Sequence, residues 1–431
     1  MTQSASNDVV ITGVGILSPI GIGVDAFRAG LAAGVPGFRR TEQLSYISSP
    51  DCVCGEVQDF NDATARKIYL RPLRKSVKLM CREIQLGVAA ALQAVDHAGL
   101  TEDTYNPERV GVSFGANLMS TAPEVLAHGV KRCLTESGEF QYDRWGEDGI
   151  GGMEPLWLLR YLPNMPGCHI GIALDVRGPN NSITHDEASG CLAIAEAVGV
   201  IRRGRADVMI TGVTGTRLHN IKTAQSLKWD VLAGGPAESR CRPLDSTRKG
   251  EVVAESSCSL VLESREHAEK RAAAILGTVL GCGTACMVSS DGKPDEQKAV
   301  EQAAAYALRN AGVTARQLGH VNMCASGNPR RDMFEAQAIR SVLDDRADVT
   351  PVTAPKSYLG SAASGSSLAE VAASLLTLQG GQIIRTLNCK TPDPLSPQNV
   401  VSGDNQPTDN RLFLKTSVTR MGQASAVVIR T

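Results

Sequence analysis

The chain has 431 residues, of which 42% are apolar, so it can bury more than one ordinary domain core. Its 44 Lys and Arg residues nearly balance 45 Asp and Glu residues, and the net charge of −1 excludes a global attraction to nucleic acid or to an anionic membrane. The 42 glycines and the aromatic share of only 4% are typical of a compact α/β enzyme with little surface for stacking bases or sugars.

Apolar strand patterns alternate with helical patterns along the first half of the chain. A strand is expected over residues 9–16 and a helix over 24–34, after a turn that contains Pro and Gly. A long helix is expected over 76–100 and a buried strand over 109–116. Residues 188–213 indicate a helix of small residues, a break at a glycine, and another strand. This alternation predicts βαβ units and a mostly parallel sheet.

The second half repeats this order over residues 360–387, where a turn of small residues precedes a helix and a strand. Ser189–Ala193 and Ser364–Ala369 share the same small-small-apolar entry into their helices, which makes an internal duplication plausible. Residues 118–165 are irregular and indicate an excursion from the core, either a cap or an arm that contacts a partner. Near its end, the run GCHIGI around His169 is interpreted as strand-like.

The twelve cysteines are dispersed through apolar segments, as reduced core thiols are in a large protein. Only Cys52 with Cys54 and Cys282 with Cys286 are close in sequence, and neither pair has the further ligands of a zinc site. The N-terminal segment has no basic region before its first strand-like run, and no apolar run is long enough to span a bilayer. We therefore expect a cytoplasmic protein without a bound metal.

Several ordered motifs resemble the β-ketoacyl-acyl-carrier-protein synthase family, in the branch that elongates fatty acids and polyketides. Residues 9–21 match the first strand and its "SP-G" turn, and residues 177–183 match the "RGPxxSI" segment before the nucleophile. Residues 204–209 match "GxADVM", and Arg242–Asp245, with Arg248 and Gly250, match "RPxDxxRxG". The resemblance covers nearly the whole chain.

The resemblance implies a thiolase-like duplicated α/β fold, a five-layered α-β-α-β-α sandwich with two mixed sheets. It places an N-terminal ketosynthase-like half at residues 1–258, with the cap or dimer excursion at 118–165, and a C-terminal half at 259–431. Members of the family normally act as dimers. The resemblance implies an acyltransferase family. Whether this chain is itself an enzyme depends on the residues at its catalytic positions.

The nucleophile position of the family is occupied by Glu187. Condensation needs a thiol at a helix N-terminus, where the dipole and backbone N–H groups lower its pKa and form an oxyanion hole. The family motif "xTACxxG" is matched here by Thr184–Gly190, which places Glu187 on the cysteine. A carboxylate cannot replace a thiolate in transthioesterification. The helix dipole should keep Glu187 ionised, either as a base or as a cap on the abandoned oxyanion hole.

Both histidine positions of the family also differ. The motif "NxHGTxTxxxDxxEA" places Cys324 on the first histidine, and "KxxxGHxxxAAG" places Ser361 on the second. The supporting residues Asp332, Glu335 and Lys356 are retained. Cys324 remains open as a relocated nucleophile, although no histidine in the local sequence would activate it.

The loop that gates the acyl pocket in this family is altered at Val418 and Arg420, where Arg420 replaces an aromatic residue. An ordinary acyl tunnel is therefore in doubt. His185, two residues before Glu187, is either a structural residue of the turn or a proton shuttle that replaces the lost histidines.

A concentrated run of basic residues interrupts the otherwise neutral chain. Because the carrier protein of this family is acidic, the run is either a docking surface for acyl carrier protein or a solvated helix face. The run consists of Arg66, Lys67, Arg71, Arg74, Lys75, Lys78 and Arg82.

Three functions remain open from the sequence. The first is a noncatalytic partner in fatty-acid or polyketide-type biosynthesis, similar to chain-length-factor subunits, which lack the cysteine and usually carry Gln there. The second is altered chemistry in which Glu187 is an acid or base on a carrier-bound acyl or polyketide substrate. The third is a conventional synthase. The expected partners are acyl carrier protein and a homodimer or heterodimer mate, and no cofactor is expected beyond the carrier's phosphopantetheine.

Overall fold

The computed structural model describes residues 8–41 and 53–431. Cys52 therefore lies outside the described residues. Ten strands follow one another in a continuous hydrogen-bonded order, β6-β5-β7-β8-β1-β9-β15-β14-β10-β11. Their bounds are β1 Val9–Ser18, β5 Val110–Gly115, β6 Asn180–Ile183, β7 Val208–Thr216, β8 Glu255–Ser264, β9 Gly277–Cys286, β10 His320–Asn322, β11 Val352–Thr353, β14 Leu412–Val418 and β15 Gln423–Arg430.

The two halves of this order have the same topology. In the first half β5 is parallel to β6 and β7, while β8 is antiparallel to β7 and β1. In the second half β10 is parallel to β11 and β14, while β15 is antiparallel to β14 and β9. The expected duplication is thus present as two five-stranded mixed sheets. They join where β1 pairs with β9 over residues Val9–Ile11. The expected boundary at residues 258/259 falls inside β8 of the first sheet.

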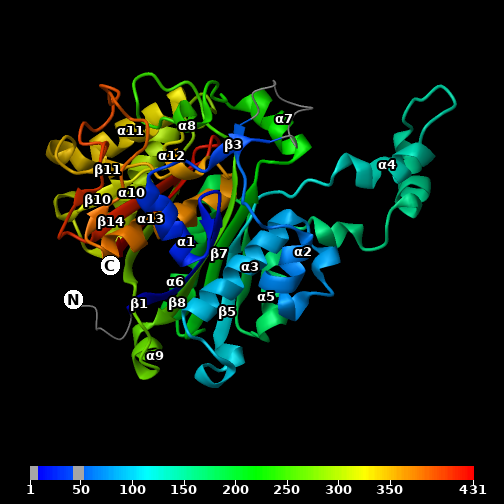
Figure 1. Cartoon of the computed structure of the whole chain (residues 1–431), viewed down its shortest axis with the longest axis horizontal. Helices are drawn as coiled ribbons and strands as arrows, with labels where there is room; N and C mark the ends of the chain where they lie inside the picture. Colours follow the sequence, from blue (N-terminus) through cyan, green and yellow to red (C-terminus); the bar gives the residue numbers. More distant parts are fainter. Residues whose placement is uncertain (1–7, 42–52) are drawn as a thin grey trace.

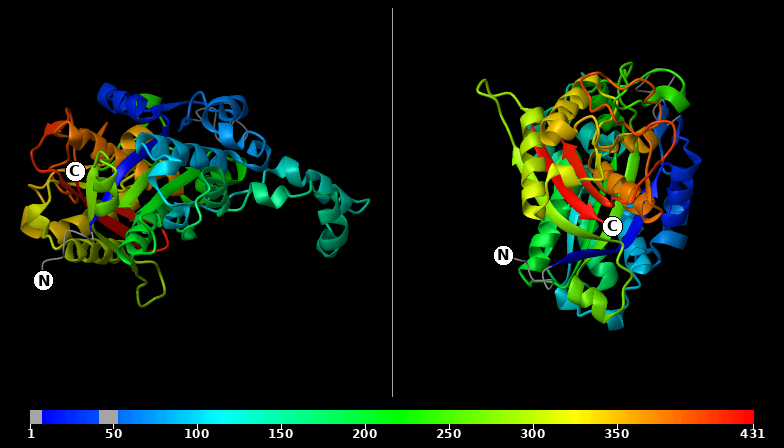
Figure 2. Two further views of the ribbon diagram at one scale, coloured as in Figure 1. Left: turned by 90° about the horizontal axis from the view of Figure 1, so that it is seen from below. Right: turned by 90° about the vertical axis from the view of Figure 1, so that its left-hand side faces the viewer.

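Helices form three layers around the two sheets (Figures 1 and 2). On the outer faces, α3 packs on β1, β7 and β8, and α10 packs on β9, β14 and β15. Between the sheets, α6 contacts β7 and β15 while α13 contacts β8 and β14. The bounds are α3 Arg82–His97, α5 Met165–Leu174, α6 Ser189–Arg202, α10 Glu296–Ala311, α11 Pro329–Leu343 and α13 Ser366–Gln379. The five-layered sandwich implied by the resemblance is confirmed.

The central helices are built from small and apolar residues because they are buried on nearly all sides. Every residue of α13 except Thr377 and Gln379 is buried. The N-termini of α6 and α13 approach closely, and a Cβ added at Gly190 would collide with the Ser367 hydroxyl. The small-residue entries that the sequence repeats are therefore the places where the two halves meet.

Smaller elements connect and decorate this core. Their bounds are α1 Val24–Ala33, α2 Asp62–Thr64, α4 Pro123–Arg132, α7 Asn220–Trp229, α8 Ala237–Arg240, α9 Arg265–Lys270, α12 Lys356–Leu359, β2 Gly21–Ile22, β3 Phe38–Arg40, β4 Val53–Gly55, β12 Gln382–Ile383 and β13 Gln406–Pro407. Within the described residues, no helix is long and apolar enough to cross a membrane.

The segment around α4 extends away from the body as an arm (Figure 1). It begins and ends near the expected bounds of residues 118–165, and several of its large apolar side chains are exposed, including Tyr142, Ile150 and Leu156. The interpretation of GCHIGI as a strand is wrong, because His169 lies in α5, a helix that packs against α3 and β5.

Candidate functional site

Asp186 and Glu187 lie in a 3₁₀ turn, Asp186–Ala188, that leads directly into α6. Asp186 has a φ of 47°, a left-handed conformation that is uncommon outside glycine. The Ser189 hydroxyl accepts a hydrogen bond from the His185 N–H at 2.9 Å. This turn holds the Glu187 side chain in the interior between the two halves.

The opposite half contains the same turn before α13. Ala363, which begins the 3₁₀ turn Ala363–Gly365, has a φ of 53°, and the Ser366 hydroxyl accepts from the Ala362 N–H at 2.9 Å. Asp186 and Ala363 are thus equivalent by duplication. Only the first copy carries acidic residues.

Glu187 forms a buried ion pair with Arg331, a residue in the first turn of α11. The Arg331 Nη2 lies 3.2 Å from Glu187 Oε1 and donates to the Val418 carbonyl at 2.9 Å. Burial raises the pKa of Glu187, but the positive charges of Arg331 and Arg217 outweigh it and lower the pKa to about 2. Glu187 is therefore ionised, as expected, but mainly because of arginines rather than the helix dipole.

Arg217 lies just after β7 and reaches the second histidine position. Its Nη1 donates to the Ser361 hydroxyl at 3.0 Å and lies 3.1 Å from the Glu251 carboxylate. It also ion-pairs with Asp230. The motif comparison missed Arg217 and Arg331. Two signals in the sequence could have indicated these arginines. Arg217 is a charged residue at the end of an apolar strand, and Arg331 is one of two arginines inside the first histidine motif.

Cys324, at the expected position of the first histidine, has a thiol that is not activated. The Lys356 Nζ lies 3.2 Å from Cys324 Sγ. Burial raises the pKa of Cys324 and outweighs the lowering by Lys356 and Lys415. Cys191, one turn beyond Glu187, is also a poor nucleophile because burial raises its pKa to about 11.

The retained supporting residues hold the backbone of the motif. Glu335 accepts hydrogen bonds from the Cys324 N–H at 2.7 Å and the Thr416 hydroxyl at 2.6 Å. Asp332 accepts from the N–H groups of Ser326 and Gly327 at 2.8 and 2.9 Å. Glu335 and Asp332 therefore stabilise the backbone of this motif by accepting its hydrogen bonds.

Little space remains between Glu187 and the residues at the expected histidine positions. A void of about 10 Å³ is lined by Glu187, Cys324, Ser361, Val418 and other residues of the motif, which is at the lower limit for one water molecule. A larger cavity of about 320 Å³ adjoins Glu187. Its charged lining consists of Asp186, Glu187, Arg217, Lys222, Asp230, Arg331 and Arg420.

Of the two expected gate residues, Arg420 lines this larger cavity and stacks on the Trp229 ring at 4.4 Å, while Val418 borders the small void. His185 is exposed, lines neither space, and its Nδ1 lies 3.0 Å from Gln423 Oε1. Among the described residues, no group of three His, Cys, Asp or Glu side chains is arranged to hold a metal ion.

The family models of the β-ketoacyl synthase N-terminal domain and C-terminal domain match residues 6–268 and 276–390. The chain belongs to the β-ketoacyl synthase family. It is 26% identical over 430 residues to a 3-oxoacyl-[acyl-carrier-protein] synthase 2 of Staphylococcus aureus strain COL, covering 99% of both chains.

Solved structures of β-ketoacyl synthases share the fold. The ishigamide ketosynthase/chain length factor superimposes with a TM-score of 0.83 at 26% identity, covering 98% of this chain and 99% of that one. A type II polyketide synthase ketosynthase in complex with its acyl-carrier protein, AntDE:AntF, has a TM-score of 0.79 at 22% identity, with coverages of 98% and 99%.

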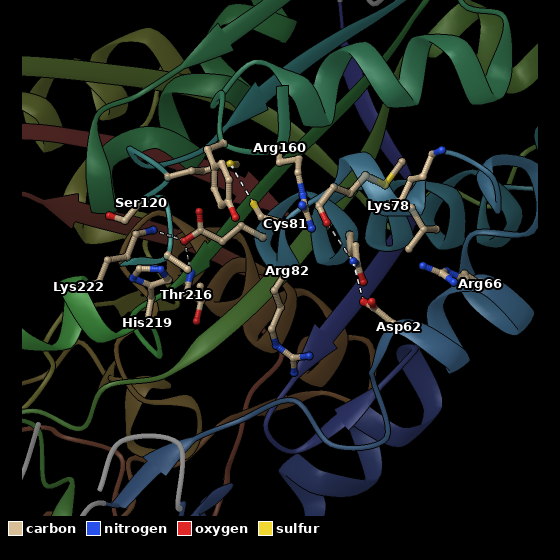
Figure 3. Close-up of a pocket in the computed structure, with 17 residues that line it drawn as sticks. Asp62, Arg66, Lys78, Cys81, Arg82, Ser120, Arg160, Thr216, His219 and Lys222 are labelled. Carbon is tan, nitrogen blue, oxygen red and sulfur yellow. Dashed lines mark hydrogen bonds and ion pairs between the residues drawn. The ribbon is translucent and has the colours of Figure 1, made fainter. Parts of the chain in front are cut away.

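The structure divides the basic run of this family member into two parts. Five of its side chains line one open surface hollow, and they are Arg66, Lys67, Arg71, Arg74 and Lys75. Lys78 is also exposed and lines a separate cavity with Arg66 (Figure 3). Arg82 differs from the rest of the run, because its guanidinium ion-pairs with buried Glu255 and donates to the carbonyls of Phe60 and Val57.

Proposed function

We propose that this β-ketoacyl synthase homologue works in fatty-acid or polyketide-type biosynthesis as a partner subunit that does not catalyse condensation itself. The observation that carries the proposal is the buried Glu187–Arg331 ion pair at the nucleophile position. Decarboxylative condensation needs a thiolate, an oxyanion hole and groups that stabilise an enolate. Here the nucleophile position is anionic, and Cys324, the thiol that lines the same small void, has a raised pKa.

The lining of the adjoining cavity supports the same proposal. Burying a hydrocarbon chain against charged groups forfeits their hydration without new hydrogen bonds. The cavity beside Glu187 is lined by seven charged side chains, so it is unsuited to a saturated acyl chain. Similarity to the ishigamide ketosynthase/chain length factor is compatible with a chain-length-factor role and equally with a ketosynthase role.

The proposed partners are acyl carrier protein and a second subunit of the same fold. The exposed basic side chains from Arg66 to Lys75 form a surface that complements an acidic carrier, and a related structure is a ketosynthase in complex with its acyl-carrier protein. The exposed apolar side chains of the arm, such as Tyr142 and Ile150, are suited to contact the second subunit. That subunit is either another copy or an active synthase.

The experiment that tests the proposal is intact-mass spectrometry of the purified protein after incubation with acyl-carrier and malonyl-carrier protein. We expect no acyl adduct and no condensed product, because acylation of the Glu187 carboxylate would give only a labile anhydride and the raised pKa of Cys324 leaves little reactive thiolate. Glu187→Cys alone should gain no condensation activity, since Arg331, Cys324 and Ser361 remain. An acyl adduct on the unmodified protein, or condensation by it alone, would overturn the proposal.

A second function is favoured by the carboxyl pair at the turn. Burial and the neighbouring Glu187 charge raise the pKa of Asp186 to about 8, while Glu187 stays ionised. A protonated and an ionised carboxyl in one polar cavity can act as acid and base on a carrier-bound β-keto chain. If this chemistry occurs, the wild-type protein should change the mass of a carrier-bound β-keto chain in the same mass-spectrometry experiment. Glu187→Gln and Asp186→Asn should each abolish that change. A change that survives both substitutions would exclude it.

A further inference from the structure

Asn322, Glu370 and Lys415 form a cluster in the interior of the second half, and all three side chains are fully buried. Asn322 ends β10 and Lys415 lies in β14, and the two are register partners across this parallel pair. Neighbouring strands lie about 4.8 Å apart, and register partners point to the same face. Both side chains point towards α13, because each contacts Glu370 of that helix. A lysine and an amide are therefore neighbours, with a carboxylate beside them.

The Asn322 amide is held through its nitrogen. Its Nδ2 donates to the Glu370 carbonyl at 2.7 Å and to the Ser374 hydroxyl at 2.8 Å, and these two residues are one turn apart on α13. Its Oδ1 is buried and has no hydrogen-bond partner among the residues that the structure describes. Buried polar atoms of this kind are rare because no hydrogen bond offsets their desolvation. The amide carbon is thus fixed in position while its oxygen is free to accept a hydrogen bond.

Two ammonium groups share the Glu370 carboxylate. The Lys415 Nζ lies 2.5 Å from Oε2, and the Lys356 Nζ lies 2.6 Å from Oε1. Burial raises the pKa of Glu335, the other carboxyl near Lys415, so Glu335 balances the second ammonium poorly. An excess positive charge in the interior is costly, and the loss of one proton from the cluster removes it.

Lys415 is the amine that lies beside the amide. Lys356 follows β11, in which the register partner of Asn322 is Thr353. The Lys356 Nζ also donates to the Cys324 carbonyl at 2.8 Å, which holds it towards the first histidine motif. The Lys415 Nζ donates to the Thr416 carbonyl at 2.6 Å, next to it in the chain, and has only to leave this oxygen to reach Asn322.

We propose that Lys415 and Asn322 join spontaneously in an isopeptide bond, with Glu370 as the proton carrier. Glu370 takes a proton from the Lys415 ammonium, and the neutral amine attacks Cγ of Asn322. A bond forms between Nζ and Cγ, the bond between Cγ and Nδ2 breaks, and Glu370 gives its proton to the departing nitrogen. The second Lys415 proton leaves with the ammonia. An ammonium group and an amide thus become a secondary amide and an ammonium ion, without an oxidant or a cofactor.

The bond would connect two segments that border the altered site. β10 leads to Cys324, and β14 leads to Val418 and Arg420. A covalent link between these strands restricts the unfolded chain, as a disulfide does, without depending on a reducing or oxidising compartment. The proposal is independent of the proposed function, because the bond forms in the protein alone.

The test is the intact mass of the purified, denatured protein, followed by mass mapping of its proteolytic peptides. We expect the wild type to weigh less than its sequence by one ammonia. A peptide that contains Asn322 should be joined to a peptide that contains Lys415, also after complete reduction. Lys415→Arg keeps a cation but has no amine that can be deprotonated, so it should have the full mass. Lys390→Arg, the same substitution at an exposed position, should keep the loss of ammonia.

A wild-type protein of full mass would overturn the proposal, and this result does not depend on whether any variant folds. A loss of ammonia confined to a single peptide, or one that persists in Lys415→Arg, would also overturn it. Loss of water in place of ammonia would put the bond on a carboxyl group and would exclude Asn322. Glu370→Gln lacks the proton carrier and should have the full mass, so a loss of ammonia in that variant would contradict the role of Glu370.

Discussion

Glu187 and Arg331 are each buried against a partner of opposite charge, with side-chain exposures of 6% and 13%. Removing Glu187 leaves the partly buried Arg331 guanidinium with the more distant carboxylate of Glu296, 4.0 Å from its Nε, as its compensating charge. We expect Glu187→Gln to lower the free energy of unfolding by about 3 kcal/mol, measured by urea denaturation. Glu154→Gln removes the acid of an exposed pair with Arg160 and should cost less than about 1 kcal/mol.

A double variant tests whether the pair is the cause. Replacing both residues, as in Glu187→Gln with Arg331→Met, should recover part of the stability that Glu187→Gln loses. The single variant Arg331→Met completes the comparison. If the stability losses of Glu187→Gln and Arg331→Met simply add in the double variant, the two residues are not coupled and the ion pair does not stabilise the site.

Asp186 should make stability depend on pH. Its folded pKa is raised to about 8 by burial and by Glu187, above the usual 3.8, so the folded state keeps a proton that the unfolded chain releases. Between about pH 4 and pH 8 the unfolded chain therefore ionises Asp186 while the folded state does not, and the free energy of unfolding falls as the pH rises. Asp186→Asn cannot ionise and retains a residue type that tolerates positive φ.

The expected result is that Asp186→Asn becomes progressively more stable than the wild type between pH 5 and pH 8. Urea denaturation at three pH values in this range measures the difference. A difference that stays constant with pH would show that Asp186 does not hold a proton in the folded state.

At the scale of elements, the carboxylate of Glu370 holds α13, α12 and β14 together. It lies 2.6 Å from the Lys356 Nζ and 2.5 Å from the Lys415 Nζ, and all three side chains are essentially fully buried. Glu370→Gln would leave two buried ammonium groups with only neutral partners. We expect a loss of about 3 to 5 kcal/mol in urea denaturation. Glu269→Gln, at an exposed pair with Arg265, is the control and should cost less than about 1 kcal/mol. Equal losses in the two variants would contradict the role of Glu370.

The sequence predicted the duplicated helices correctly, but it did not predict the helix around His169 or the ion pairs of Arg217 and Arg331. The repeated entries at Ser189 and Ser364 indicated the duplication because two close-packed helices both need small residues where they meet. The run around His169 misled because four to six apolar residues fit a buried strand and a buried helix equally well. Arg217 and Arg331 escaped notice because their partners are distant in sequence, and an ion pair of that kind is set by the tertiary fold.

For the whole molecule, motif order was sufficient to predict the thiolase-like sandwich, since matches spread over nearly the whole chain constrain both halves. What the motifs could not predict is how the altered site is filled. The expected substitution of the nucleophile and both histidines leaves open whether the space is empty or occupied, and the structure shows arginines and carboxylates around Glu187, Cys324 and Ser361. The site is therefore rebuilt around buried charge, which supports a role without condensation.

The most direct measurement of this role is a reconstitution with acyl-carrier protein, malonyl-carrier protein and an active synthase of the same pathway, read out by the mass of the carrier-bound products. We expect no product from this protein alone. With the active synthase, its addition should change the yield or the chain length of the products, and Glu187→Gln should leave condensation by the synthase intact. Condensed product from this protein alone, or no effect on the synthase at any ratio of the two proteins, would contradict the proposed partner role.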